Sequence, residues 1–78
     1  MKTTLEYIIE KILPNTSDKI KISEESTNGY VIFTIETEDE IKPLLIGRNG
    51  KTIKAIYNLL YPIAKRERIY NFQIKIKD

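Results

Sequence analysis

The chain contains no cysteine, no histidine and no tryptophan among its 78 residues. Without cysteine it cannot form disulfides or thiolate metal sites. Without histidine it lacks the most common general base of enzymes and the most common protein metal ligand. The composition therefore does not favour catalysis, and we expect a protein that is not an enzyme and that needs no metal and no cofactor.

Long hydrophobic runs are absent as well. Charged residues interrupt segment 1–13 before the core of a signal peptide could form. No stretch approaches the roughly 20 consecutive apolar residues that a membrane-spanning helix needs. The length suits one small domain, residues 1–78, with a shallow binding surface. We therefore expect a single-domain protein located in the cytoplasm.

Acidic and basic residues are unevenly distributed. The net charge is only +2, but residues 1–41 hold four lysines against nine acids, a net charge of −5. Residues 42–78 hold nine lysines and arginines against two acids, a net charge of +7. A basic half favours a polyanion as partner, because the local field rather than the net charge steers association. Chance partition in a small, highly charged protein is the alternative.

Hydrophobic periodicity predicts six elements in the order α-β-β-α-α-β. Apolar residues recur at helical spacing in three segments, and three others alternate or are rich in β-branched residues. Helices are predicted at about 4–13, from about 39 or 40 through Leu45, and at about 51–66, and strands at 19–23, 30–37 and 70–76. The polar segment 24–29 ends in Asn28-Gly29, a strong turn signal.

Four local signals refine the helix boundaries. Thr-x-x-Glu capping boxes begin at Thr3 and at Thr37. Proline is tolerated in the first turn of a helix but not in its interior, so Pro43 favours a late start for the short helix. Pro62 lies inside the third predicted helix, where it predicts a kink or an early end near Tyr61.

This element order predicts a two-layer α+β domain. The first two strands pair antiparallel across their turn, whereas the second and third are joined through two helices and can lie parallel, with the second strand in the centre. We expect a three-stranded mixed sheet covered on one face by three helices. The residues expected in the core are Leu5, Ile8, Ile9, Ile12, Leu13, Ile20, Ile22, Val31, Phe33, Ile35, Ile53, Ile56, Leu59, Leu60, Ile63, Ala64, Tyr70, Phe72, Ile74 and Ile76.

Between the second and third predicted helices lies the segment Gly47-Arg48-Asn49-Gly50. Glycine tolerates positive φ and has no Cβ, so a ligand backbone can approach closely. The helix that follows supplies unpaired N–H groups and a partial positive charge, which favour phosphate. Lys51 stands in its first turn, where the helix dipole disfavours a cation. This combination favours a loop that binds phosphate.

The segment Ile46–Ile53 matches the I-G-x-x-G-x-x-I signature of KH domains throughout. The flanking elements resemble the β-α-α-β core of that family, and the additional α-β at the N-terminus corresponds to the type II KH arrangement. The resemblance covers essentially the whole chain, whose length is similar to that of the small single-KH RNA-binding proteins of bacteria (KhpA-like). The loop is also similar to that of the longer Jag-type proteins, but this chain lacks their second nucleic-acid-binding domain, so we do not expect a Jag role.

The resemblance implies that the loop clamps the backbone of about four unpaired RNA nucleotides. The two glycines would admit the strand, the cations would neutralise phosphates, polar side chains would add hydrogen bonds, and apolar residues would form or support a groove for bases. The implied RNA-binding residues are Lys42, Leu45, Ile46, Gly47, Arg48, Asn49, Gly50, Lys51, Thr52, Ile53 and Lys54. The implied role is that of a bacterial post-transcriptional regulator or RNA chaperone, which could form a homodimer or a heterodimer with another RNA-binding protein.

Simpler interpretations exist for the same residues. Gly47 could be an ordinary helix C-cap and Gly50 a tight turn without a ligand. Basic residues at the end of the third helix, Lys65, Arg66 and Arg68, could be a solvated end that compensates the helix dipole. We favour that interpretation for those three. Tyr57 and Tyr61 could stack on bases, but tyrosines on an amphipathic helix more often pack at the edge of a core.

Three other functions are compatible with parts of the pattern. Gly50-Lys51-Thr52 resembles the end of a Walker A motif, but that motif needs glycine at position 45, which is Leu45. Two helices that flank a glycine-containing turn are also typical of a helix-turn-helix protein that binds duplex DNA. A KH-fold module without RNA binding could instead dimerise through the outer face of the sheet, where Tyr30 and Ile32 are expected.

Overall fold

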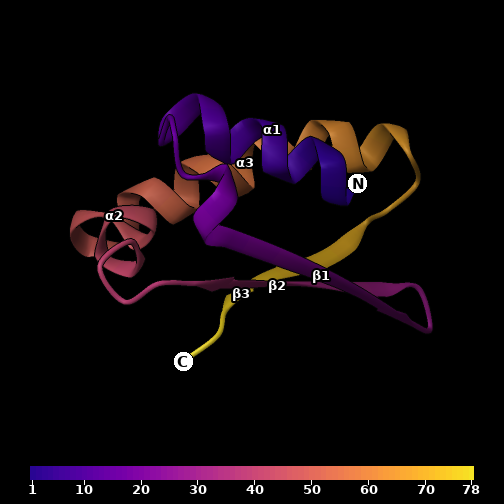
Figure 1. Ribbon diagram of the computed structural model, residues 1–78. Helices are drawn as coiled ribbons and strands as arrows, with labels where there is room; N and C mark the ends of the chain where they lie inside the picture. Colours follow the sequence, from indigo (N-terminus) through magenta and orange to yellow (C-terminus); the bar gives the residue numbers. More distant parts are fainter.

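A computed structural model describes all residues, 1–78. Its helices lie on one side of a three-stranded sheet, and both chain termini lie at the surface (Figure 1). The helices and strands are α1 (Lys2–Ile12), β1 (Ile20–Thr27), β2 (Tyr30–Thr37), α2 (Lys42–Ile46), α3 (Lys51–Arg66) and β3 (Asn71–Ile76), with single 3₁₀ turns at Ser17–Lys19 and Arg48–Gly50. The predicted order α-β-β-α-α-β is therefore confirmed.

The sheet has the predicted topology, with β2 in the centre. β1 and β2 are antiparallel, from the pair Ile20 and Thr37 to the pair Thr27 and Tyr30. β3 is parallel to β2, with Phe72 opposite Val31. The fold is thus α+β with a mixed sheet.

The core lies between this sheet and the layer formed by α1 and α3, while α2 extends the layer at one end, beside α3 (Figure 1). Twelve buried residues form one cluster: Leu5, Ile8, Ile9, Ile22, Val31, Phe33, Ile35, Leu45, Ile56, Leu60, Ala64 and Phe72. Two predicted core residues are instead exposed, Leu59 (53%) and Tyr70 (61%). Leu59 lines a hollow between α3 and α1, and Tyr70 precedes the first paired residue of β3.

Both predicted capping boxes are wrong. α1 begins at Lys2 without any side-chain cap, so Thr3 is already inside the helix. Thr37 is the last residue of β2, and its hydroxyl donates a hydrogen bond to the carbonyl oxygen of Lys19 (3.0 Å). α2 starts at Lys42, even later than predicted, and Pro43 lies in its first turn as expected. At Thr37, strand pairing and the hydrogen bond to Lys19 prevailed over a local capping signal.

The structure differs from the prediction at Pro62 and at the end of β1. α3 continues past Pro62 to Arg66. Leu60 and Ala64 on either side of the proline are completely buried, and this packing offsets the missing backbone hydrogen bond. β1 extends to Thr27, because Asn28 (φ 51°) and Gly29 (φ 79°) form a two-residue hairpin turn that lets pairing continue to the end. None of the helices is long and apolar enough to cross a bilayer.

Candidate nucleic-acid interface

The loop between α2 and α3 has an unusual backbone. Three of its four residues have positive φ: Gly47 (φ 78°, ψ 169°), Asn49 (φ 55°, ψ 27°) and Gly50 (φ 75°, ψ 16°). Two hydrogen bonds hold it in place. The N–H of Gly47 donates to the carbonyl of Pro43 (2.9 Å), and the N–H of Gly50 donates to the carbonyl of Gly47 (3.1 Å). The loop is therefore a defined turn.

The two glycines serve different purposes. A Cβ at position 47 would lie 2.7 Å from the backbone nitrogen of Thr52, a separation that side chains do not adopt. At position 50 the nearest atom, Cγ2 of Ile53, would be 4.0 Å away, so only the positive φ favours glycine there. Gly47 thus lets the end of α2 pack against the start of α3, and Gly50 provides the left-handed step into that helix.

The polar side chains of the loop are available to a ligand. Arg48, Asn49, Lys51 and Lys54 are all exposed, and Thr52 is half-buried. Neither of the two ion pairs in the structure involves these cations. The loop and the first turn of α3 therefore present three unpaired positive charges beside backbone N–H groups, an arrangement suited to phosphate.

Lys42 differs from the other predicted cations. Its Nζ lies 3.6 Å from a carboxylate oxygen of Asp39, and its side chain is only 23% exposed. The ion pair already neutralises part of its charge. Lys42 is therefore close to the loop but less available to phosphate than Lys51 or Lys54.

The apolar residues flanking the loop divide into core and surface. Leu45 is completely buried in the core beside the loop, whereas Ile46 is 39% exposed. Ile53 is half-buried and packs against the core cluster. Leu44, which is not among the predicted binding residues, is 54% exposed on α2. Ile46 and Ile53 are thus the predicted apolar residues that a ligand could touch.

A groove of about 300 Å³ runs from the start of α3 to strand β3. Ile53 and Lys54 connect it to the loop. Its lining residues are Tyr30, Ile53, Lys54, Tyr57, Phe72, Gln73 and Ile74. The rings of Tyr57 and Phe72 are stacked, with centroids 4.6 Å apart, and the Tyr30 hydroxyl donates a weak hydrogen bond to Oε1 of Gln73 (3.4 Å).

The β3 side of this groove, formed by Phe72, Gln73 and Ile74, was not predicted from the sequence. The predicted parallel pairing of the second and third strands could have indicated this side of the groove. A strand that returns parallel after α3 must lie beside that helix. Its outer edge is open, because β3 pairs only with β2.

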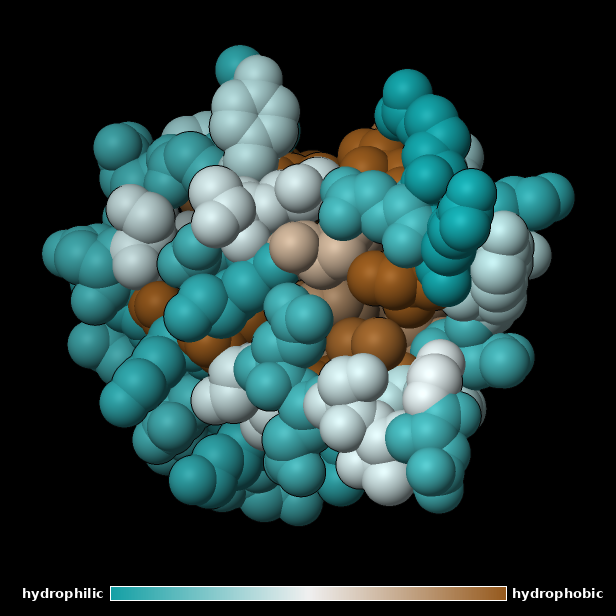
Figure 2. All heavy atoms as spheres, turned by 90° about the vertical axis from the view of Figure 1, so that its right-hand side faces the viewer, coloured by the Kyte–Doolittle hydropathy of each residue, from teal (hydrophilic) through white to brown (hydrophobic).

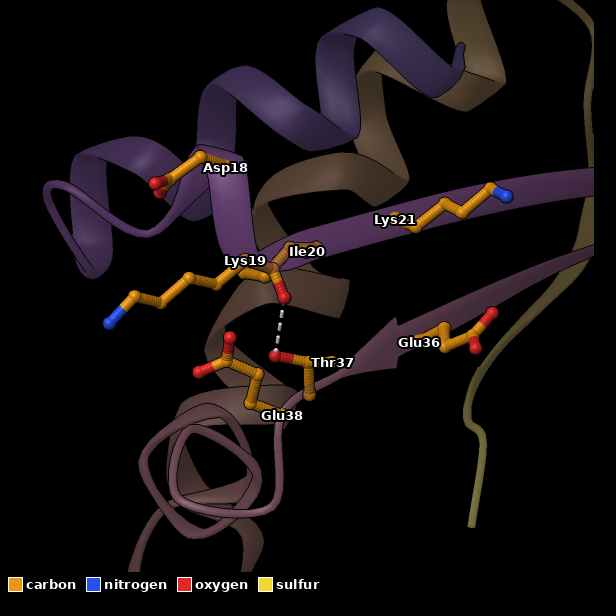
Figure 3. Close-up of a pocket in the computed structure, with 7 residues that line it drawn as sticks. All are labelled: Asp18, Lys19, Ile20, Lys21, Glu36, Thr37 and Glu38. Atoms are coloured by element: carbon orange, nitrogen blue, oxygen red, sulfur yellow. Dashed lines mark hydrogen bonds between the residues drawn. The ribbon is translucent and has the colours of Figure 1, made fainter.

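A second hollow, of about 360 Å³, lies at the opposite edge of the sheet where β1 begins and β2 ends. Its lining residues are Asp18, Lys19, Ile20, Lys21, Glu36, Thr37 and Glu38. Figure 3 shows the charged side chains spread around the rim, with the hydrogen bond from Thr37 to the Lys19 carbonyl across the middle. Three acids and two lysines with no aromatic residue do not suit a polyanion, and the chain has no cluster of metal-ligating side chains.

Comparison with known proteins gives a consistent result. The family model for the KH domain of KhpA and KhpB matches residues 2–76. The RNA-binding protein KhpA of Chlamydia pneumoniae is 30% identical over 69 residues, which cover 88% of this chain and 87% of that protein. The proteins of the same name from Chlamydia trachomatis and Chlamydia caviae are 28% and 30% identical over the same shares. No solved structure gives a significant match.

Proposed function

The chain belongs to the KhpA/KhpB family of KH domains, and from this premise we propose that it binds single-stranded RNA through the loop Gly47–Gly50 and the adjoining groove. The proposal rests above all on one observation. A loop with three positive φ angles places unpaired Arg48 and Lys51 at the N-terminus of α3. Membership of a family whose relatives are named RNA-binding proteins supports the same conclusion.

In this proposal the loop holds the sugar–phosphate backbone. Gly50 leaves room for the strand, whereas the space at Gly47 is filled by Thr52. The N–H of Lys51 already donates to the carbonyl of Arg48, but the following N–H groups in the first turn of α3 lack intrahelical partners and can donate to phosphate oxygens. Arg48 and Lys51 neutralise phosphates, while Asn49 and Thr52 add hydrogen bonds. Backbone clamping of this kind holds about four nucleotides in KH domains.

Bases would lie in the groove between α3 and β3. Ile46 and Ile53 provide an apolar surface near the loop, and Tyr57 stacked on Phe72 extends it. The open edge of β3 carries unpaired backbone N–H and C=O groups, which can hydrogen-bond to exposed base edges. Such edges are accessible in unpaired nucleotides but not in the deep major groove of an A-form duplex. The groove therefore favours a single strand.

The helix-turn-helix alternative receives less support from the geometry. A recognition helix must enter the major groove of DNA. α3 instead packs lengthwise on the sheet through Ile56, Leu60 and Ala64, which are completely buried, and Tyr57 contacts β3. For the Walker A alternative, the segment before the loop is helix α2 rather than a strand.

The wider biological role is also a proposal. We propose a bacterial cytoplasmic protein of one KH domain that acts by binding, as a post-transcriptional regulator or RNA chaperone, without enzyme activity. We further propose that it pairs with a second copy or with another RNA-binding protein. The hollow of about 270 Å³ between α1 and α3 supports this pairing. It is lined mainly by apolar groups, among them the exposed Tyr7 and Leu59.

The test is a binding comparison among labelled single-stranded RNA, duplex RNA and duplex DNA of matched length. We expect clear binding only of the single strand. Preferential binding of duplex DNA would support the helix-turn-helix alternative and contradict the proposal. If the protein bound none of the three nucleic acids and sedimented as a dimer, the remaining interpretation would be a KH-fold module that dimerises without binding RNA.

A further inference from the structure

Helix α3 carries a stripe of two tyrosines flanked by two lysines that continues far beyond the loop. Lys54, Tyr57, Tyr61 and Lys65 are spaced three or four residues apart, so they share one helix face. The ring of Tyr61 lies 6.2 Å from that of Tyr57 and 6.3 Å from that of Phe72. The stripe therefore borders strand β3 and extends the groove toward the C-terminal end of α3.

At that end the stripe meets further exposed residues. Tyr61 is 43% exposed and Tyr70 is 61% exposed, and Lys65 and Arg68 are exposed as well. We call these four residues the distal patch. Tyr61 and Lys65 lie in α3, and Arg68 and Tyr70 lie in the turn that follows it. Hydrogen bonds hold this turn, since the N–H of Arg68 donates to the carbonyl of Lys65 (3.0 Å) and that of Ile69 to the carbonyl of Ala64 (2.8 Å).

We propose that the distal patch is a second RNA subsite, which binds nucleotides beyond those held by the loop. The inference rests on the proposed function and extends it to a longer strand. Exposed aromatic rings offer stacking surfaces for any base, and neighbouring cations contact the phosphates, the combination found in proteins that bind single strands without sequence preference. Tyr61 and Tyr70 provide the rings, and Lys65 and Arg68 provide the charges.

Helix stabilisation alone does not account for this patch. Lys65 lies in the last turn of α3, where a cation compensates the helix dipole. Arg68 lies beyond the helix with φ 63°, an unusual conformation for arginine. Tyr70 leaves most of its surface in water instead of packing in the core. Figure 2 views this end of the molecule and shows hydrophobic side chains in a hollow between hydrophilic ones.

Position and charge point to the same occupant. From Lys51 to Lys65 the helix advances about 20 Å at 1.5 Å per residue, so the patch lies well away from the loop on the same side of the domain. Glu67 is the only acid in segment 61–70, against three basic residues. No ion pair involves any of them. The surplus positive charge is complementary to a strand that leaves the loop along α3.

The experiment compares fluorescein-labelled random-sequence RNAs of 4 and 12 nucleotides. The variant Lys65→Gln/Arg68→Asn removes two charges, and asparagine tolerates the positive φ at position 68. The control Lys19→Gln/Lys21→Gln removes two exposed charges at β1, the opposite edge of the sheet. We expect the variant to bind the 12-mer about tenfold more weakly than the wild type and the 4-mer within about twofold. The control should match the wild type at both lengths.

A Tyr61→Leu variant and a footprint provide independent readouts. Leucine keeps apolar bulk against Phe72 but loses the stacking surface, so it should also weaken only the 12-mer. In ¹⁵N-labelled wild-type protein, the amides of Tyr61 and of residues 63–70 should shift with the 12-mer and not with the 4-mer. Unchanged 12-mer affinity in the variant, equal losses at both lengths, or a loss of dimer with RNA binding intact would each overturn the inference. Failure of the wild type to bind either RNA would instead refute the proposed function.

Discussion

The chain contains two Asn-Gly dipeptides with nearly the same φ angles, and only one lies in the candidate site. Asn28 and Gly29 have φ of 51° and 79°, and Asn49 and Gly50 have φ of 55° and 75°. The first pair closes the hairpin between β1 and β2, and the second precedes α3, at the opposite end of the molecule (Figure 1). Local turn chemistry is thus the same in both places.

What surrounds the two turns differs. A Cβ added at Gly29 would meet no atom within 4 Å, and that turn joins two strands with exposed acids nearby. The second turn has an additional glycine, Gly47, pressed against Thr52, and it opens into a helix N-terminus. It is also flanked by unpaired cations. In the proposed function, the second turn suits phosphate because it combines positive φ with a helix N-terminus and unpaired cations.

The largest expected effect comes from placing acids in each turn. In Arg48→Asp/Asn49→Asp, the side-chain contacts of Arg48 and Asn49 to RNA are lost and the new aspartates repel the phosphates. RNA binding should therefore weaken by about 30-fold or more, as measured by fluorescence anisotropy. Because both side chains are exposed, the melting temperature should hardly change. The control variant Thr27→Asp/Asn28→Asp lowers the net charge by two, against three in the loop variant, and should bind like the wild type. Equal losses in both variants would mean that net charge alone governs binding.

The glycines of the two turns should differ in their importance for stability. Gly47→Ala combines a backbone conformation reserved for glycine with a clash against Thr52, and should cost about 2–4 kcal/mol in the free energy of unfolding. Gly29→Ala meets only the cost of positive φ, about 1–2 kcal/mol. Urea denaturation of the two variants measures the difference. A Gly47→Ala protein as stable as Gly29→Ala would show that the packing of Gly47 on Thr52 is unimportant.

Salt dependence tests whether the charges around the second turn contact phosphates. With three phosphates neutralised, log affinity should fall with log salt at a slope of about −2, since single strands give roughly 0.7 per phosphate. Replacing Arg48 by Gln should reduce the steepness by about 0.7. Replacing Asn28 by Gln should leave the slope unchanged. A slope near zero for the wild type would refute phosphate neutralisation.

The smallest expected effect separates two lysines near the loop. Lys54→Gln removes an exposed, unpaired charge and should weaken RNA binding by about threefold. Lys42→Gln removes a charge already paired with Asp39, so its effect should stay within about twofold. Titrations in the same buffer distinguish them. A larger loss for Lys42→Gln than for Lys54→Gln would contradict the assigned roles.

Much of the fold could be predicted because hydrophobic periodicity and turn residues indicated the same helices and strands. β2 (Tyr30–Thr37) and α3 (Lys51–Arg66) have the predicted bounds, and β2 lies in the centre of the sheet as expected. The failures have tertiary causes. Thr37 bonds to the Lys19 carbonyl instead of capping a helix, and buried neighbours carry α3 through Pro62.

The candidate site could be predicted in part for a similar reason. Its loop is local in sequence, so the glycine spacing and the cations were sufficient to locate it. The groove joins α3 to β3, and its β3 side depends on how the chain packs in three dimensions. The sequence also could not show which cations are free to bind phosphate, because the ion pair of Lys42 with Asp39 is a contact in the folded structure and not a sequence pattern.

One measurement tests the central claim most directly: a titration of ¹⁵N-labelled protein with a short single-stranded RNA, followed by the backbone amide shifts. The amides of Gly47 to Lys54 should shift with increasing RNA, while those of Asn28 and Gly29 stay in place. Shifts concentrated at the hairpin, or shifts absent from the loop while the RNA still binds, would contradict the account.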